Sequence, residues 1–403
     1  MKFIEGGVCA AQGFTASGIH CGIRKNRDKR DLALIVSQKR AAAAAVYTQN
    51  LVKGAPLMVT KANIADGYAS AILCNSGNAN TCNADGEEVA QKMCALAADA
   101  LGIPAADVVV ASTGVIGQRL DISPIAAGME ALVSGLSTNA LPAAEAILTT
   151  DTKVKSVAVE FSLGGKTAHL GGIAKGSGMI HPNMATMLVF VTTDAAIAPG
   201  MLQKALSADV QTSFNRISVD GDTSTNDMCC VLANGMAGNA EITAEGEDYA
   251  AFCAALNAVT TALCRMIARD GEGATKLVEC ALTGAKTQAA ADAVSKAVIC
   301  SSLVKAAMFG SDANWGRVLC AIGYTPGNFD ISKTSVRLKS KAGEVFVCEN
   351  AAYHPYSEEE AAVVLKEDEI DILVDLGSGD ATAKAWGCDL TYDYVKINGD
   401  YRT

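Results

Sequence analysis

The segment KGSGMIHPNMATMLVFVTTD, residues 175–194, holds the most reactive arrangement that the sequence suggests. A glycine-rich polar loop runs there directly into a series of strand-forming residues, and Thr186 is the first of that series. Pro182 fixes its own φ angle and disfavours helical backbone at His181, so we expect a constrained turn before Thr186. A strained peptide bond beside a hydroxyl group is a place where an autocatalytic cut could occur.

Cleavage between Ala185 and Thr186 would leave a threonine with two reactive groups. The hydroxyl attacks the preceding carbonyl in an N-to-O acyl shift, and water then hydrolyses the ester. The new α-amino group titrates near ~7.7–8.0, so it could serve as the general base for the hydroxyl of the same residue. Taken alone, a threonine at the start of a strand is more often a β-branched structural residue, and composition leaves that alternative open.

Other familiar catalytic patterns do not occur in the sequence. The glycines of residues 171–178, GGIAKGSG, match neither GxxxxGK nor GxGxxG. No GxSxG elbow is found, and the four histidines form neither HExxH nor HxxxH. The 14 cysteines include no CxxC pair. These patterns therefore support neither a phosphate-binding loop nor a dinucleotide site, and a histidine-dependent triad or metal site stays open without a motif to indicate it.

The stretch KGSGMIHPNMATML resembles the cleavage and nucleophile signature of the glutamate/ornithine N-acetyltransferase family, in which the bond before the threonine of Met-Ala-Thr-Met-Leu is cut. Further motifs in similar order cover nearly the whole chain. They are VYTQNLVKGAP, NSGNANTCNADG, ASTGVIG, TTDT, FNRISVDGDTSTND, ARDGEGATK, GSDANWGR and the C-terminal INGDYRT. His181 departs from the family pattern, where a small residue is expected. The combined resemblance favours a nucleophilic Thr186.

The resemblance also implies the roles of individual residues. Thr186 accepts the acetyl group as an ester, and Thr113 and Gly114 correspond to the oxyanion hole that stabilises the tetrahedral intermediates. The implied substrate contacts are Thr152, Lys175, Thr186, Glu272, Asn398 and Thr403. Without the resemblance, the STG element would indicate a turn or helix cap, and Lys175 and Glu272 would be ordinary loop charges.

The activity implied by the resemblance is a ping-pong transfer of acetyl from N2-acetylornithine to glutamate in arginine biosynthesis. It releases ornithine and N-acetylglutamate and needs no metal or cofactor. Some members of the family also use acetyl-CoA, and no residue here decides between one donor and two. Two rival interpretations are a self-processing aminopeptidase or amidase that passes the acyl group to water, and a non-catalytic binding protein that kept the scaffold.

The segments that must position these residues alternate between strand and helix patterns. Strands are predicted at residues 32–36, 69–74, 108–111, 157–161, 187–192 and 370–376. Helical periodicity is found at residues 87–101, 201–214, 249–268 and 289–308. Ser357 and Glu360 have the spacing of a capping box, which predicts a helix start. The class is α/β or α+β, and the sheet topology stays open.

The fold implied by the resemblance is a layered α/β sandwich of sheets between helices, similar to self-processing aminopeptidases, with a smaller C-terminal α/β portion. Cleavage would give an α chain of residues 1–185 and a β chain of residues 186–403. In space, we expect a main catalytic domain of about residues 1–284 and a smaller domain of about residues 285–403. The family's assembly, two α and two β chains, is expected here as well.

Composition excludes several other classes. A net charge of −10 argues against sequence-independent nucleic-acid binding. The one basic cluster is interrupted by Asp28 and Asp31 and is interpreted as a solvated turn; it comprises Arg24, Lys25, Arg27, Lys29 and Arg30. Neither a signal peptide nor a run of ~20 apolar residues is found, so we expect a cytoplasmic protein with no membrane span. Many free thiols suit a reducing compartment, and cysteines such as Cys264 and Cys320 are predicted as small core residues.

Overall fold

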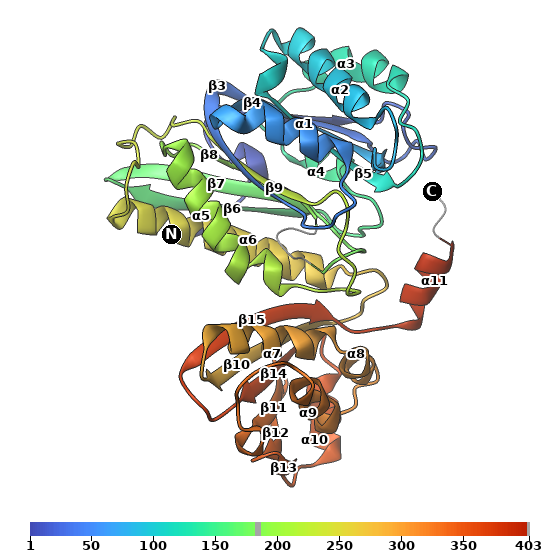
Figure 1. Cartoon of the computed structure of the whole chain (residues 1–403), viewed down its shortest axis with the longest axis vertical. Coiled ribbons are helices and arrows are strands. Elements are labelled where there is room, and N and C mark those ends of the chain that lie inside the picture. Colours follow the sequence, from blue (N-terminus) through green and yellow to red (C-terminus); the bar gives the residue numbers. More distant parts are fainter. Residues whose placement is uncertain (182–186, 401–403) are drawn as a thin grey trace.

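A computed structural model describes residues 1–181 and 187–400, and it confirms a layered α/β fold (Figure 1). Among these residues the strands form two separate sheets. The larger has nine strands in the order β1-β6-β7-β8-β9-β3-β4-β5, with β2 paired to β3. They are β1 Lys2–Ile4, β2 Phe14–Ile19, β3 Leu32–Tyr47, β4 Tyr68–Asn78, β5 Val108–Val115, β6 Lys155–Leu163, β7 Lys166–Lys175, β8 Leu188–Thr193 and β9 Met228–Ala233.

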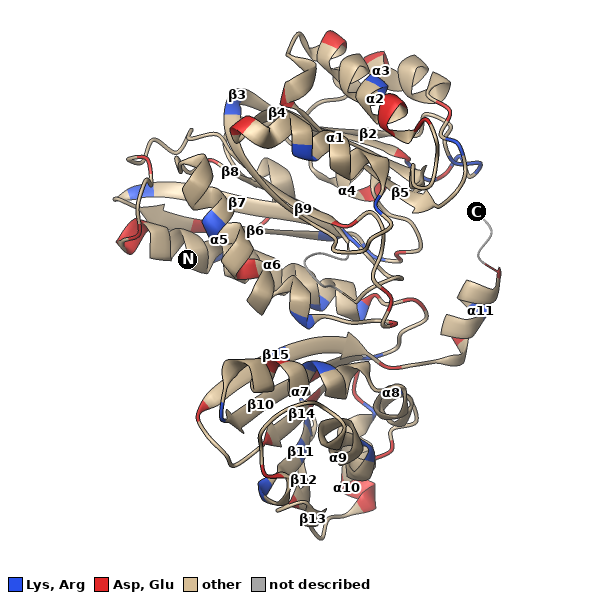
Figure 2. Cartoon of the chain, in the orientation of Figure 1, with Lys and Arg blue, Asp and Glu red and all other residues tan. Residues whose placement is uncertain are grey.

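Helices cover both outer faces of this sheet (Figure 1). They are α1 Ala55–Asn63, α2 Gly86–Leu101, α3 Ser123–Ser134, α5 Pro199–Thr212 and α6 Glu247–Arg269. The short helix α4 Leu141–Ala146 instead buries its alanines in the inner core. Charged side chains lie mainly on helices and loops, and the central strands carry few of them (Figure 2). Such strands are expected where both faces of a sheet are covered.

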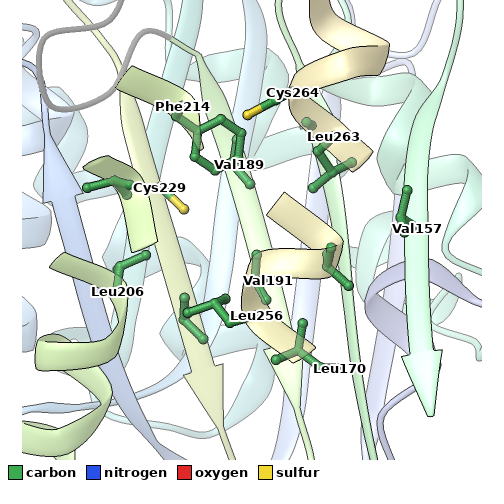
Figure 3. Close-up of a cluster of buried hydrophobic side chains, with 14 of the residues drawn as sticks. Val157, Leu170, Val189, Val191, Leu206, Phe214, Cys229, Leu256, Leu263 and Cys264 are labelled. Atoms are coloured by element: carbon green, nitrogen blue, oxygen red, sulfur yellow. The ribbon is translucent and has the colours of Figure 1, made fainter. Parts of the chain in front are cut away.

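The alternation of side chains along each strand separates the layers. In β8, Val189 and Val191 join a core beneath α5 and α6, which Figure 3 shows in close-up. Leu188 and Phe190 point the other way, into an inner core shared with β2 to β5. Side chains of β5 alternate in the same way between this inner core and a third core under α1, α2 and α3. The result is a sandwich with the layers helix, sheet, sheet, helix.

Strand β3 connects the two halves of the sandwich. Its first part pairs with β4 and its alanine-rich second part pairs with β9, with a register shift between Val36 and Ala41. The sequence predicts only residues 32–36 of this strand, because alanine is depleted in strands and gives no strand signal. The buried small side chains from Ala41 to Ala45 instead allow close packing between the layers.

The second sheet belongs to the C-terminal part of the chain and has the order β13-β12-β11-β14-β10-β15. Its strands are β10 Leu277–Ala285, β11 Ser335–Ser340, β12 Gly343–Glu349, β13 Ala352–Tyr353, β14 Glu369–Asp375 and β15 Ala381–Cys388. The remaining helices are α7 Gln288–Cys300, α8 Ser302–Phe309, α9 Trp315–Gly323, α10 Glu358–Leu365 and α11 Tyr392–Asp400. Since β10 pairs with β14 and β15, we propose that the spatial division lies before β10, ahead of residue 284.

Two sequence expectations about helices have different outcomes. The helix predicted at residues 289–308 is in fact two helices, α7 and α8. Ser301 adopts extended backbone between them, and its hydroxyl accepts a hydrogen bond from the backbone N–H of Val304, which caps α8. The capping box is confirmed, because the Ser357 hydroxyl accepts a 3.2 Å hydrogen bond from the N–H of Glu360 at the start of α10.

Helix α6 is, over the described ranges, the one helix long and apolar enough to cross a membrane by length and composition. The sequence analysis searched for unbroken apolar runs and did not single out this helix, because its apolar residues are spread along it. The face carrying Phe252, Leu256 and Leu263 packs on the sheet, as in a core helix. One prediction about the cysteines is wrong: Cys320 is exposed on α9, whereas Cys264 is buried as predicted.

Candidate active site

A cavity of about 310 Å³ opens where several strands of the larger sheet end. Five of the residues that sequence resemblance singled out line it, namely Thr113, Gly114, Lys175, Glu272 and Asn398. They come from β5, from the end of β7, from the segment after α6 and from α11. Because these elements lie far apart in sequence, the fold itself assembles the site.

Thr113 and Gly114 lie where the pairing of β4 and β5 becomes irregular. The register shifts at Gly77 and Asn78, opposite these two residues. Gly114 has a φ of 134°, and a Cβ atom there would lie 2.3 Å from the carbonyl carbon of Gly77. Only glycine fits both the backbone angle and the close approach. Such a distorted strand end can turn backbone and side-chain donors toward a ligand.

Lys175 places its positively charged side chain beside Thr113. It is the last residue of β7, it is buried, and its Nζ donates a 3.3 Å hydrogen bond to the Thr113 hydroxyl. A buried ammonium group at this position can stabilise a developing negative charge or bind a ligand carboxylate.

Glu272 and Asn398 also line the cavity. The Asn398 Nδ2 donates a 2.7 Å hydrogen bond to Oε2 of Glu272, whose side chain is buried. A Cβ atom on Gly178 would lie 2.3 Å from the Glu272 carboxyl carbon, so glycine at this position leaves room for the carboxylate. The pair offers a negative charge and an amide, which suit a ligand ammonium group.

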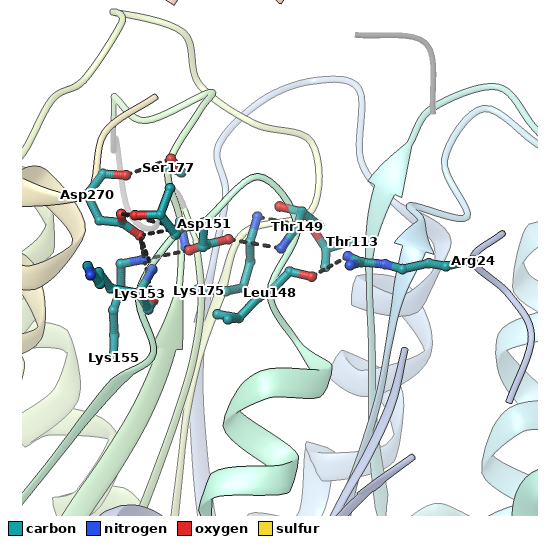
Figure 4. A network of polar contacts seen from close by, with 12 residues as sticks. Arg24, Thr113, Leu148, Thr149, Asp151, Lys153, Lys155, Lys175, Ser177 and Asp270 are labelled. Carbon is teal, nitrogen blue, oxygen red and sulfur yellow. Dashed lines mark hydrogen bonds and ion pairs between the residues drawn. The ribbon is translucent and has the colours of Figure 1, made fainter. Parts of the chain in front are cut away.

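A buried polar network holds these walls in place (Figure 4). The Nζ of Lys155 donates 2.6 Å hydrogen bonds to both Asp151 and Asp270. Asp151 accepts from the backbone N–H groups of Thr149, a cavity residue, and Gly176, which follows Lys175. Burial alone would raise the pKa of Asp151, but the positive charges of Lys155 and Lys175 hold it well below the ordinary value of 3.8. Asp151 is therefore ionised and acts as an anchor.

The sequence analysis assigned no role to the cavity residues Ser224, Thr225 and Asn226. Asn226 is buried and connects several segments, because its Nδ2 donates to the carbonyls of Ala79 and Ser112. Its Oδ1 accepts from the Thr81 and Thr225 hydroxyls. The available signal was the run of polar residues before strand β9. The sequence analysis used the motif FNRISVDGDTSTND, which contains this run, only as part of the family resemblance.

Asp227 follows this run and is buried beside the cavity. A small space of about 20 Å³ is lined by Asp227 together with Thr113, Lys175 and Met187. Its Oδ2 atom has no hydrogen-bond partner among the described residues. Burial raises the pKa of Asp227 well above the ordinary value of 3.8. An orphan carboxyl oxygen at this point is suited to exchanging a proton with a neighbouring group.

The segment before the expected cleavage point is fixed by Asp220. Its two carboxylate oxygens accept 2.8 Å hydrogen bonds from the backbone N–H groups of Met179 and Ile180. Met179 has a positive φ of 51°, an uncommon angle for this residue type. The Thr223 hydroxyl donates to the carbonyl of His181, which extends the support by one residue.

One predicted residue does not line the cavity, and three others lie outside the described residues. Thr152 is exposed, and its backbone N–H and hydroxyl both donate to Asp270, whereas Thr149 and Thr150 of the same TTDT motif line the cavity. Ala185, Thr186 and Thr403 lie outside the described residues. Met187 is the first described residue after Thr186, and its carbonyl accepts a 2.8 Å hydrogen bond from the N–H of Met228. In residues 1–181 and 187–400, no group of three or more His, Cys, Asp or Glu side chains is arranged to hold a metal ion.

Comparison with known proteins gives concordant matches. A model of the ArgJ family matches residues 15–403. The arginine biosynthesis bifunctional protein ArgJ of Caldanaerobacter subterraneus subsp. tengcongensis is 49% identical, with all of both chains covered. The protein of the same name from Symbiobacterium thermophilum is 50% identical, again over both whole chains. A crystal structure of arginine biosynthesis bifunctional protein ArgJ from Bacillus halodurans is 49% identical with a TM-score of 0.50, covering 53% of this chain and 98% of that chain.

Proposed function

The chain belongs to the ArgJ family and is an acetyltransferase of arginine biosynthesis, and we propose that it carries acetyl from N2-acetylornithine to glutamate through an ester on Thr186. The observation that carries this proposal is the meeting of Thr113, Gly114, Lys175, Glu272 and Asn398 around one cavity. A carboxylate there suits a substrate ammonium group, and a lysine suits a carboxylate or a developing oxyanion.

The reaction has two acyl-transfer steps. In the first, the Thr186 hydroxyl oxygen bonds to the acetyl carbon of acetylornithine, the amide C–N bond breaks, and the hydroxyl proton leaves on the ornithine amine. In the second, the amine nitrogen of glutamate bonds to the same carbon, the ester C–O bond breaks, and an amine proton returns to the threonine oxygen. In both tetrahedral intermediates the former carbonyl oxygen of the acetyl group carries a negative charge. Thr113 and Gly114, with Lys175 nearby, would stabilise this oxygen.

Thr186 becomes this nucleophile through cleavage after Ala185, which divides the chain into residues 1–185 and 186–403. The length of the solved Bacillus halodurans chain supports this. Nearly all of that chain, 98%, matches only 53% of the present one. Residues 186–403 are 218 of the 403 residues, about 54%. We propose further that two copies of each fragment assemble, and mass photometry of the mature protein tests that α2β2 stoichiometry.

Two relatives carry the word bifunctional in their names. We therefore include acetyl-CoA as a second donor, which would acetylate the same threonine and release coenzyme A as its thiol.

The decisive experiment supplies acetylornithine to the purified protein with and without glutamate. We expect ornithine to be released in a burst of at most one equivalent without glutamate, and continuously with it. Sustained release without glutamate would favour the rival hydrolase, which passes the acetyl group to water. A protein that runs as one uncut band on a denaturing gel and releases no ornithine would favour the non-catalytic binding protein.

A further inference from the structure

A second cavity, of about 450 Å³, lies beside the connection between β2 and β3. Its size is within the range of small-molecule sites. Four cations line it, Arg24, Arg27, Lys29 and Arg30, in a protein whose net charge is −10. Figure 2 shows Lys and Arg gathered on the loop that joins these two strands. The sequence analysis interpreted this cluster as a solvated turn.

Pairing within the protein neutralises some of these charges but not all. Arg30 is paired with Glu145 at 3.0 Å, and Asp151 is paired with Lys155. Arg27 and Lys29 are exposed, and no ion pair is found for either among the described residues. Asp28 opposes them with one negative charge. The cavity therefore keeps an excess of positive charge that an anionic ligand could neutralise.

The loop that presents these cations is held in a fixed shape. The buried carboxylate of Asp31 accepts hydrogen bonds from the backbone N–H groups of Cys21, Gly22 and Arg24. The guanidinium of Arg24 also donates to the carbonyl of Leu148. A loop anchored in this way presents its charges without a large loss of conformational entropy on binding.

We call the second cavity the basic cavity, and the cavity lined by Thr113 and Lys175 the acetyl-transfer cavity. The two share one wall. Leu148 and Asp151 line the basic cavity, whereas Thr149 and Thr150, between them, line the acetyl-transfer cavity. Figure 4 shows three separate polar contacts in this region, between Lys175 and Thr113, between Thr149 and Asp151, and between Arg24 and Leu148. The two cavities therefore adjoin each other along residues 148–151.

We propose that the basic cavity binds the phosphorylated nucleotide end of the coenzyme A donor while its acetyl group lies at Thr113. This inference rests on the proposed function, in which acetyl-CoA is the second donor. Acetylornithine has no phosphate groups and would use only the acetyl-transfer cavity. Acetyl-CoA would use both cavities. In the transfer, the threonine C–O bond forms, the thioester C–S bond breaks, and the proton moves to sulfur.

The test compares two thioester donors that differ only in the nucleotide end. Acetyl-CoA carries the nucleotide with its phosphates, and S-acetylpantetheine carries only the pantetheine arm with the same thioester. The double variant Arg27→Gln, Lys29→Gln should lower the preference for acetyl-CoA over the truncated thioester, measured as the ratio of kcat/KM values, by about tenfold or more. Adenosine 3′,5′-bisphosphate should compete with acetyl-CoA in the wild type.

Lys25→Gln is the matched control, because Lys25 lies in the same loop, is exposed and does not line the cavity. Its preference should stay within about twofold of the wild type. An equal loss in both variants would overturn the proposal, since loop charge alone would explain it. Inorganic phosphate competing as well as the bisphosphate would also overturn it.

The acetylornithine reaction separates this proposal from the proposed function. A wild type that transfers acetyl from acetylornithine but not from acetyl-CoA overturns the coenzyme A site and the second donor, and leaves the proposed acetylornithine reaction standing. A wild type that uses neither donor overturns the proposed function, and with it this inference.

Discussion

Asn398 donates a 2.7 Å hydrogen bond to Glu272 across 126 residues of sequence, so the C-terminal helix α11 completes the cavity begun by the larger sheet. The helix extends away from the second sheet toward the first part of the molecule (Figure 1). The cavity and the helix near the C-terminal end of the chain are therefore linked through one carboxylate.

Glu272→Gln should weaken recognition of the substrate ammonium group, because the amide keeps the shape and removes the charge. We expect KM for acetylornithine to rise by about tenfold or more with a smaller change in kcat. Asn398→Ala should cause a smaller rise, since the carboxylate remains. Glu241→Gln, at an exposed position far from the cavity, is the control. An unchanged KM in Glu272→Gln would place the ammonium group elsewhere.

Asp220→Ala should slow maturation, because Asp220 fixes the backbone of Met179 and Ile180 ahead of the expected cut. The measured quantity is the rate at which the full-length band disappears after synthesis, and we expect a fall of about tenfold. Asp222→Ala removes an exposed carboxylate two residues away and serves as control. Equal rates in the two variants would show that the segment needs no such support.

Thr113→Ala should lower kcat by on the order of 10²-fold with little change in KM, because an oxyanion-hole donor acts on the transition state. Steady-state kinetics of the mature variant decide this, and the amount of cleaved chain must be measured beside it. A raised KM with an unchanged kcat would make Thr113 a ground-state substrate contact.

The sequence could predict the parts of the site that depend on local patterns. Thr113 and Gly114 lie at the end of strand β5, and the motif ASTGVIG identifies them. The loop after Lys175 follows the end of strand β7, and the motif KGSGMIHPNMATML identifies it. Long-range pairing was not predictable in the same way. No local pattern indicates that Asn226 joins the segments of Ala79 and Ser112, or that β10 pairs with β14 instead of extending the first sheet.

His181, the departure from the family pattern, should contribute a pH dependence of stability. Burial, with a further effect of Lys296, lowers the pKa of its ring from 6.5 to about 4. Between these values the unfolded chain binds a proton that the folded chain does not, so the free energy of unfolding should decrease as pH falls from 6.5 to about 4. His181→Gln should lose part of this decrease. Thermal melting at pH 7 and pH 4.5 tests it, and parallel curves for both proteins would contradict it.

Thr186 is the residue on which the proposed mechanism depends, although it lies outside the described residues. Thr186→Ala lacks the hydroxyl needed for the acyl shift, so it should remain one chain of 403 residues and transfer no acetyl group. Thr186→Ser keeps a hydroxyl and should be cut at least in part, with the new N-terminus at residue 186. Intact-mass measurement and N-terminal sequencing follow the cut, and the acetylornithine assay follows the activity. An active Thr186→Ala protein, or a wild type that is fully active while uncut, would exclude this threonine as the nucleophile released by cleavage.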